Sequence, residues 1–437
     1  ITQCNANCPD GNGGTEACIS CSISPEVPCK ARSWNQPEGT MCDAALHPDL
    51  PDGEPCDFNA IGDGVCMSGA CTGDPPFPCT EQGILDAIAA GGGPHFFDCA
   101  GPTTINTSGY IDIDNDVVLD AEGNITLDGG GTHGLIAVPP GVTAELIGFT
   151  IQGAGGLGQV AFVSSGDVTL RDVNFTNNIP TTTATGAVYN SGVLTVFGGV
   201  YAGNSTIACG PTSCGSPFAS DLVNEGTANL YRVTLSEVGN AQTFDGDEFS
   251  IPGVLNIYDS FLNVAWYPQT VSNCTVGASG AIVGGEAPTT ISNSTLVGAL
   301  LWDSVPGETL TVRGSIVSFA DPAALADAIV VSEGFNIYGT DTGAFDQPTD
   351  QLDPGLLAAS LGELADNGGP TPTLLPGPGS IAINAIPAAE CLDADGAPLT
   401  TDQRGISRPQ GAACDIGAVE VEPAAFFSPT CGGCDAT

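Results

Sequence analysis

The sequence predicts an all-β chain whose main part is a right-handed parallel β-helix, a solenoid in which every turn adds one strand to each face. Three observations lead to this prediction. Segments of similar pattern recur between residues 100 and 340, apolar and polar residues alternate within each segment, and an Asn or Asp recurs where the alternation breaks. Alternation with a period of two is typical of strands, and a repeat of roughly 20 to 50 residues is typical of solenoids.

Residues 1–78 form a predicted small module that depends on disulfides, because this stretch is rich in proline and cysteine and has little apolar periodicity. The chain has 18 cysteines, of which 11 lie in the first 99 residues. So many cysteines are typical of an oxidising compartment, so we expect a secreted or cell-surface protein. The pairs Cys18/Cys21 and Cys431/Cys434 also have the spacing of zinc ligands. Neither pair is followed by a matching second pair, so we favour disulfides.

Later cysteines are close in sequence in three cases, and we expect each case to be a disulfide: Cys209 with Cys214, Cys391 with Cys414, and Cys431 with Cys434. Cys274 stands alone. It occupies a repeat position that faces inward and is equivalent to Ser260 and Ser294. We therefore predict a buried free thiol at Cys274.

The repeated segments begin at Val168, Leu194, Ala228, Leu255, Gln269, Thr289 and Leu310, which are 14 to 34 residues apart and about 24 on average. In each segment the third, sixth and eighth positions are apolar or small. The step from the third to the sixth position breaks the alternation, so we expect a corner there, with Asp172, Asp259, Asn273 and Asn293 in the turn. The 14-residue interval is too short for a whole turn of average length. We therefore expect one of the two segments that it separates to lie on a different face of a single turn.

Four stretches resemble parts of known bacterial β-helix and surface proteins. "CTEQGILDAIAAGGGPHFFDC" (79–99) is similar to the opening of bacterial secreted β-helix proteins, and "GAVYNSGVLTVFGGVYAGN" (186–204) is similar to turns of polymorphic outer-membrane and pectate-lyase-like proteins. "LADNGGPTPTLLPGPGSIAINAI" (364–386) and "TDQRGISRPQGAACDIGAVE" (401–420) resemble the choice-of-anchor Q type C-terminal region of bacterial surface proteins.

This resemblance implies a capping helix at the start of a β-helix over residues 79–349 and a disulfide between Cys79 and Cys99. It also implies a C-terminal capping or anchor-type region over residues 350–437, which we expect to close the end of the stack. Separately, "PEGTMCDAALHPDLPDGEPCDFNAIGDGVCMSGACTG" (37–73) resembles the cysteine-rich segments of disintegrin-like modules. That resemblance implies a binding or spacer module over residues 1–78.

The charge balance excludes two classes of partner. Seven Lys and Arg face 50 Asp and Glu, for a formal net charge of −43. So few cations cannot replace counterions along a nucleic acid, and such a charge argues against docking on anionic lipid. No run of 18 apolar residues occurs, so we expect no insertion into a membrane.

A search for catalytic residues leads to none. A β-helix lyase needs an arginine or lysine base beside bound calcium, and the only basic residues of the predicted turns are Arg171, Arg232 and Arg313. We read these three as surface arginines that balance nearby acids. With 50 acids, a carboxylate pair at glycosidase spacing would arise by chance. We therefore favour a protein that is not an enzyme.

Calcium is the one cofactor that the acidic clusters could hold, because it binds several carboxylate and carbonyl oxygens. The candidate ligands are Asp57, Asn59 and Asp63; Asp112, Asp114 and Asp116; Asp245 and Asp247 beside Glu248; and Asp393 with Asp395. None of the clusters matches the twelve-residue calcium loop, and the acidity also fits solvation in salty water.

These observations favour an extracellular, non-catalytic structural or adhesive cell-surface protein, one that self-associates into fibres or matrix or binds a surface glycan. The alternative is a secreted polysaccharide-binding or polysaccharide-degrading β-helix protein. An aromatic-lined groove beside an arginine and a metal would favour that alternative.

Overall fold

The computed structural model describes residues 76–422 except 157–159, 180–186, 206–220, 241–242, 246–247, 251–253, 267, 285–287, 298, 303–308, 319–328, 342 and 358. In the strands between residues 236 and 302 only some side chains are described, and before residue 76 only the backbone of β1 (Cys8–Pro9), β2 (Thr15–Glu16), β3 (Pro55–Cys56), β4 (Gly64–Met67) and β5 (Ala70–Gly73). The chain divides into two compact units, residues 1–76 with 93–95, and residues 77–92 with 96–437.

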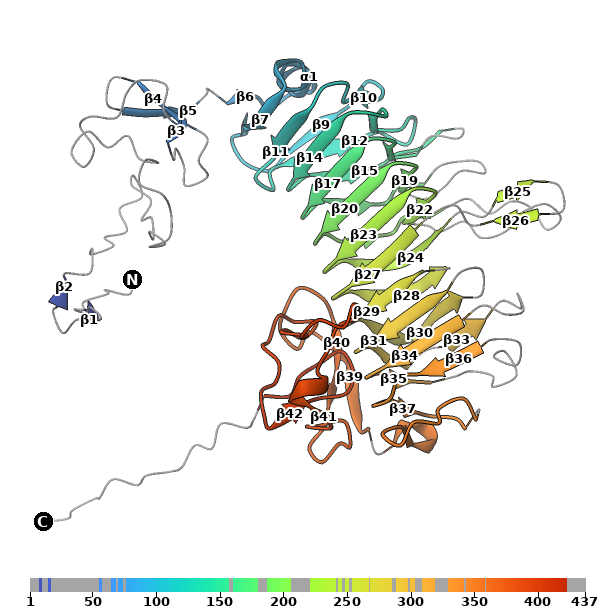
Figure 1. Cartoon of the computed structure of the whole chain (residues 1–437). Helices are drawn as coiled ribbons and strands as arrows, with labels where there is room; N and C mark the ends of the chain where they lie inside the picture. Colours follow the sequence, from blue (N-terminus) through green and yellow to red (C-terminus); the bar gives the residue numbers. More distant parts are fainter. Residues whose placement is uncertain are drawn as a thin grey trace, which may run out of the picture. The chain divides into compact units, whose positions relative to one another are not determined.

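The second unit is a parallel β-solenoid, as the sequence predicts, with strands stacked turn upon turn (Figure 1). One face of the turns is an 11-stranded sheet, here called the first sheet. Its strands are β7 (Gly92–His95), β11 (Val117–Asp120), β14 (Thr143–Ile147), β17 (Asp167–Arg171), β20 (Val193–Phe197), β23 (Thr227–Tyr231), β27 (Val254–Tyr258), β29 (Thr270–Ser272), β31 (Thr289–Ser292), β34 (Thr309–Arg313) and β36 (Ile329–Ser332).

A 13-stranded second sheet forms another face. Its strands are β10 (Ile111–Asp112), β13 (Ile136–Val138), β16 (Phe162–Ser164), β19 (Val188–Asn190), β22 (Leu222–Asn224), β24 (Thr234–Asn240), β28 (Phe261–Trp266), β30 (Thr275–Gly284), β32 (Thr295–Leu296), β33 (Ala299–Trp302), β35 (Ile316–Val317), β37 (Ile337–Tyr338) and β38 (Gln351–Leu352). The early turns have a third sheet made of β9 (Thr103–Asn106), β12 (Ile125–Asp128), β15 (Thr150–Gln152), β18 (Asn174–Thr176) and β21 (Tyr201–Ala202).

The third sheet ends at β21, and in the next turn β24 of the second sheet changes the length of a turn. Thr234, at the start of β24, bridges to Val200 beside the last third-sheet strand, whereas Val238 further along β24 pairs with Leu222 of the second sheet. One long strand thus replaces two short strands and the corner between them. Later turns need fewer residues for this reason.

This change corrects one expectation from the sequence. Ile257 of β27 pairs directly with Val271 of β29 in the first sheet, 14 residues later. The two segments therefore lie on the same face of consecutive turns, and 14 residues complete a turn. The prediction that they lie on different faces was wrong, because it compared the interval with the average repeat of about 24 residues, whereas turns after β24 are shorter.

The corner after each first-sheet strand is confirmed at all four predicted positions. Asp172, Asp259, Asn273 and Asn293 have φ values of 51°, 51°, 57° and 47°. Asn and Asp adopt this left-handed conformation more readily than other non-glycine residues. Gly198 occupies the same corner in another turn, with a φ of 72°. The corner directs the chain from the first sheet into the next strand.

The interior holds apolar side chains, and in the later turns it also holds a ladder of polar acceptors. Leu170, Val196 and Ile257 are fully buried on the inner face of the first sheet. From Ser260 onward, the inward side chain just past the corner accepts the backbone N–H of the preceding turn. Ser260 N–H donates to Cys274 Sγ, and Cys274 N–H donates to Ser294 Oγ. Cys274 is buried and free, as predicted.

A helix begins the solenoid, as the resemblance implies. α1 (Glu81–Ala90) starts at Thr80, whose hydroxyl accepts the N–H of Gly83 at 3.1 Å. Ile84 and Ile88 on its buried face belong to the same apolar cluster as the inner residues of the first turns. A disulfide joins Cys79 to Cys99, which confirms the implied pairing, and β6 (Phe77–Pro78) pairs with β8 (Phe97–Asp98) beside it.

Three antiparallel strand pairs and two short helices complete the elements described in the solenoid unit. They are β25 (Thr243–Asp245) with β26 (Glu248–Ser250), η2 (Pro354–Leu356), β39 (Leu361–Ala365) with β40 (Thr373–Pro376), η3 (Ala388–Glu390), and β41 (Ile386–Pro387) with β42 (Ala413–Cys414). The expected disulfide between Cys391 and Cys414 is present in the C-terminal region.

The C-terminal region packs along the flank of the solenoid. Asn273 Nδ2 donates to the carbonyl of Thr401 at 3.3 Å, and Asn293 Nδ2 donates to that of Leu392 at 2.8 Å. Arg313, two turns beyond Asn273, contacts Glu390 at 3.0 Å. These contacts place residues 390–401 beside the corners of successive turns (Figure 1), whereas β38, at the start of the region, pairs with β37 at the end of the stack.

Candidate functional site: an acidic cleft at the end of an aromatic ladder

The outer face of the first sheet carries a column of stacked side chains. Arg171, Phe197, Tyr231 and Tyr258 are paired in register on four successive strands. The ring centres of Phe197 and Tyr231 are 5.0 Å apart and those of Tyr231 and Tyr258 are 4.9 Å apart, with an angle of only 11° between the tyrosine rings. These three rings are called the aromatic ladder below. Their spacing follows from the spacing of about 4.8 Å between strands.

One end of the aromatic ladder is closed by a cation. The guanidinium carbon of Arg171 lies 4.6 Å from the centre of the Phe197 ring, and Arg171 also forms an ion pair with Glu145. A guanidinium over an aromatic face is attracted by the negative charge of that face. Arg171 therefore stabilises the stack at the Phe197 end.

The other end of the aromatic ladder is open. Tyr258 is followed in register by Ser272, whose side chain is too small to cover a phenol ring. One face of Tyr258 packs on Tyr231, and the opposite face is directed along the stack above Ser272. The ladder thus ends on an aromatic face that no side chain of the next turn stacks on.

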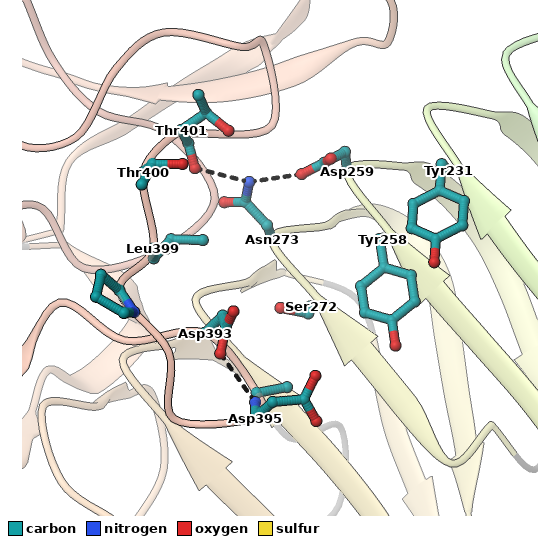
Figure 2. A pocket seen from close by; sticks show the side chains of 12 residues that line it. Tyr231, Tyr258, Asp259, Ser272, Asn273, Asp393, Asp395, Leu399, Thr400 and Thr401 are labelled. Carbon is teal, nitrogen blue, oxygen red and sulfur yellow. Dashed lines mark hydrogen bonds between the residues drawn. The ribbon is translucent and has the colours of Figure 1, made fainter.

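A cleft of about 190 Å³ lies at this end, between the solenoid and the C-terminal region (Figure 2). It is lined on the solenoid side by Tyr231, Tyr258, Asp259, Ser272 and Asn273, and on the other side by Asp393, Ala394, Asp395, Pro398, Leu399, Thr400 and Thr401. Asn273 joins the two sides, because its Nδ2 donates to Asp259 Oδ1 at 2.7 Å and to the Thr401 carbonyl. We call this space the acidic cleft.

The side chains that line the acidic cleft carry net negative charge. Its lining includes three carboxylates and no Lys, Arg or His. Burial raises the pKa of Asp259, although the hydrogen bond from Asn273 and the charge of Arg232 act in the opposite direction. Burial also raises the pKa of Tyr231, and the charges of Asp259 and Asp395 raise it further. The tyrosine hydroxyls therefore stay protonated in a field that favours positive charge.

A turn of the C-terminal region shapes one wall of the cleft. Asp393 Oδ1 accepts the N–H groups of Asp395 and Ala397 at 3.0 and 2.8 Å, so it orders the loop that follows (Figure 2). The side chain of Asp395 is exposed at the rim. Asp393 thus acts mainly on the backbone, whereas Asp395 presents its charge to the cleft.

A buried arginine holds the C-terminal region together behind this wall. The side chain of Arg408 is fully buried and donates to the carbonyls of Asp415 and Gly417 at 2.8 and 2.6 Å. It also lies 3.4 Å from Glu420 Oε2 and 3.4 Å from Asn273 Oδ1. Burial lowers the pKa of Arg408, and the nearby carboxylates oppose this effect. Arg408 connects the "QRGISRP" stretch to a solenoid corner.

The predicted metal ligands fall in three kinds of place. Asp112, Asp114 and Asp116 are exposed, and Asp116 Oδ1 accepts the N–H of Thr143 at 2.8 Å. Asp393 and Asp395 line the acidic cleft. The other candidate ligands and two of the expected disulfides lie outside the residues whose side chains are described: Asp57, Asn59, Asp63, Asp245, Asp247, Glu248, Cys209–Cys214 and Cys431–Cys434.

Within the described part of the chain, no three His, Cys, Asp or Glu side chains are grouped closely enough to hold a metal ion. Calcium binding therefore stays a prediction.

In the same part of the chain, no helix is both long and apolar enough to cross a membrane.

The three arginines that the sequence singled out lie at separate positions in the solenoid. Arg171 and Arg313 both end first-sheet strands, several turns apart, and Arg313 lies beside Glu390. Arg232 occupies a corner position with a φ of 57°. Their surroundings fit the reading as charge-balancing residues.

Sequence reasoning did not single out Tyr231, Tyr258, Asp259 and Asn273 as neighbours of Asp393 and Asp395. A signal for the ladder was present, because the aromatic residue recurs at the fourth position of "LTVFGG", "ANLYRV" and "LNIYDS". The cleft itself joins segments about 130 residues apart, as the contact between Asn273 and Thr401 shows, and no local pattern indicates such a contact.

Comparison with known proteins gives no further guide to the function: no protein-family model matches the chain, and no curated protein or solved structure matches it either.

Proposed function

We propose that this protein is an extracellular, non-catalytic structural or adhesive protein of a cell surface, in which the solenoid is the supporting rod. The observation that supports this most is the fastening of the C-terminal region to the corners of successive turns, through Asn273, Asn293 and Arg313. Such side-chain contacts join two parts of the chain into one firm element. The resemblance of residues 364–386 and 401–420 to a surface-protein C-terminal region agrees with this role.

Imaging of the natively purified, full-length protein by electron microscopy tests the structural version of the proposal. We expect ordered fibres or networks of rods, or attachment of rods to cell surfaces that display glycans. Single rods that neither assemble nor attach to any surface would contradict the proposal. Repeating the imaging with a calcium chelator then reports whether a metal ion contributes to the joints.

A second candidate is a secreted polysaccharide-binding or polysaccharide-degrading protein, and the acidic cleft beside the aromatic ladder is the observation that favours it. Incubation with a panel of acidic and neutral polysaccharides separates the two candidates. Release of shortened or unsaturated sugars would establish the degrading version and overturn the non-catalytic proposal.

A further inference from the structure

The acidic cleft combines an open aromatic ring face with a negatively charged lining, and a ligand could use both. We propose that it binds one protonated amino-sugar unit of a cationic polysaccharide, with the sugar ring on the open face of Tyr258 and its ammonium group near Asp395 and Asp259. This inference rests on the proposed adhesive function and names the glycan class that the rod would hold.

The open face of Tyr258 is the first part of the argument. Aromatic faces carry negative charge and attract the positively polarised C–H groups of a sugar ring as well as cations. The other rings of the ladder are covered on both faces, Phe197 by Arg171 and Tyr231, and Tyr231 by Phe197 and Tyr258. Only Tyr258 therefore offers a ring face, and it does so where the cleft begins.

The charge of the lining is the second part. Asp259, Asp393 and Asp395 contribute carboxylates, and no Lys, Arg or His lies among the lining residues. An anionic sugar would be repelled there. A neutral sugar could donate hydroxyl hydrogen bonds to the carboxylates but would gain no attraction between opposite charges. An ammonium group gains attraction from the carboxylates and from the aromatic face.

The size and polarity of the cleft are the third part. A volume of about 190 Å³ is below the range of about 300–1,000 Å³ typical of drug-sized ligands, so it suits one unit of a longer chain. The lining is mostly polar, with the hydroxyls of Thr400 and Thr401 beside Asn273. Hydroxyl-bearing ligands match such walls better than the alkyl stem of a lysine.

The cleft is also held in shape before any ligand arrives. Asn273 has a left-handed corner conformation and links Asp259 to the Thr401 carbonyl. Arg408 supports Asn273 from behind at 3.4 Å. A preformed site loses less entropy on binding than a flexible one.

Isothermal titration of the full-length protein with short glucosamine oligomers, at a slightly acidic pH that keeps the amines protonated, tests the proposal. N-acetylated oligomers of the same length are the matched uncharged probe, and a lysine oligomer is the matched cationic probe. We expect the glucosamine oligomers to bind at least about tenfold more tightly than either of the others. Equal or tighter binding of the N-acetylated or the lysine oligomers would overturn the assignment to an amino sugar.

Two variants locate the binding. Tyr258→Ala removes the open ring face, and Phe197→Ala removes the ring at the opposite end of the same ladder as its control. Asp395→Asn removes one exposed charge of the cleft, and Asp167→Asn removes an exposed charge of a first-sheet strand elsewhere. We expect Tyr258→Ala and Asp395→Asn each to raise Kd about tenfold, with little change in the two controls. Equal effects of cleft and control variants would place binding elsewhere and overturn the proposal.

The outcome for this site is separable from that for the proposed function. Assembly or surface attachment without glucosamine binding would overturn the site and leave the adhesive proposal standing. Cleavage of a polysaccharide, together with glucosamine binding that depends on Tyr258, would support the site and overturn the non-catalytic proposal.

Discussion

Inside the solenoid, the Sγ atom of Cys274 accepts the backbone N–H of Ser260 on the neighbouring turn, at 3.5 Å. Cys274 thereby takes the place that Ser294 and Ser315 hold in later turns, where each hydroxyl accepts the N–H of the preceding turn at 3.1 Å. The ladder continues to Asn336, whose Oδ1 accepts the Ser315 N–H at 3.0 Å. The thiol is thus one member of a continuous series of buried acceptors.

Replacing Cys274 tests this role. Cys274→Ser keeps an acceptor of the kind that neighbouring turns use, so the free energy of unfolding should change by less than about 1 kcal/mol. Cys274→Ala leaves a buried N–H without a partner, which should cost about 1–3 kcal/mol. Urea denaturation of both variants measures the difference. Equal stability of the two would mean that the Ser260 N–H does not depend on this acceptor.

The same location should make the thiol unreactive. Burial raises the pKa of the Cys274 thiol, so little thiolate exists at neutral pH and none is accessible. We expect a thiol reagent to label Cys274 only in denaturant, as mass spectrometry of its peptide would show. Rapid labelling of the native protein at this residue would contradict the buried ladder.

Arg408 should be essential to the C-terminal region. Arg408→Met leaves the buried Glu420 carboxylate without its nearest cation, which should cost about 3–5 kcal/mol. The double variant with Glu420→Gln removes the stranded charge and should regain part of this loss. Arg171→Met is the matched control. The side chain of Arg171 is 46% exposed in its ion pair with Glu145. This substitution should therefore change the free energy of unfolding by about 1 kcal/mol or less. Similar losses in both arginine variants would contradict the importance of burial.

The sequence was sufficient to predict the solenoid, the corners and the inner thiol, because each depends on a local pattern repeated from turn to turn. Asn273 stands where the apolar alternation breaks, which predicted a corner at this residue. Its left-handed φ confirms that corner. The 14-residue turn was misread because the merging of two sheets at β24 changes how many residues a turn needs. That merging depends on pairing between strands, which alternation alone does not encode.

The flank position of the C-terminal region was also beyond local reasoning. Asp393 and Asp395 attracted attention as acids, but their neighbours Tyr258 and Asp259 come from a turn more than 130 residues earlier. One of the contacts that bring them together is a hydrogen bond from a corner asparagine to a backbone carbonyl. A backbone acceptor is available at nearly every residue, so the sequence does not mark which one is used.

Acidic pH should stabilise the protein relative to neutral pH. Burial raises the folded-state pKa values of Asp259, Asp415 and Glu420 above their ordinary values. Stabilisation from their protonation is therefore fully present below the ordinary pKa values and is lost as the pH rises through the raised ones. We expect the free energy of unfolding to fall between moderately acidic and neutral pH. An increase over that range would contradict the raised values.

Asp259→Asn isolates one of these groups. Asn already occupies the equivalent corner at Asn273 and Asn293, so the backbone conformation should be retained. The variant cannot ionise, and its stability should fall less between acidic and neutral pH than that of the original protein. Asp167→Asn, an exposed change of the same charge, should leave the slope nearly unaltered. Thermal melts over a pH series measure all three slopes.

The tie between Asn293 and Leu392 can be separated from the corner conformation. Asn293→Gly removes the hydrogen bond to the Leu392 carbonyl but suits the φ of 47°, so it should cost about 0.5–1.5 kcal/mol. Asn293→Ala loses the same bond and also places a Cβ in the left-handed region, which should add about 1–2 kcal/mol. Denaturant unfolding should therefore rank alanine below glycine. The reverse order would mean that the corner does not constrain this residue.

Salt and calcium should act on stability in distinguishable ways. With 50 acidic and seven basic residues, self-repulsion opposes the compact state, and screening shortens its range from about 10 Å at 0.1 M to about 3 Å at 1 M ionic strength. Sodium chloride should therefore raise Tm. Calcium chloride at the same ionic strength should raise Tm further if it also binds the folded protein, and we expect this extra rise to disappear on addition of a chelator. Equal melting temperatures in the two salts would leave screening as the whole effect and would remove calcium as a cofactor.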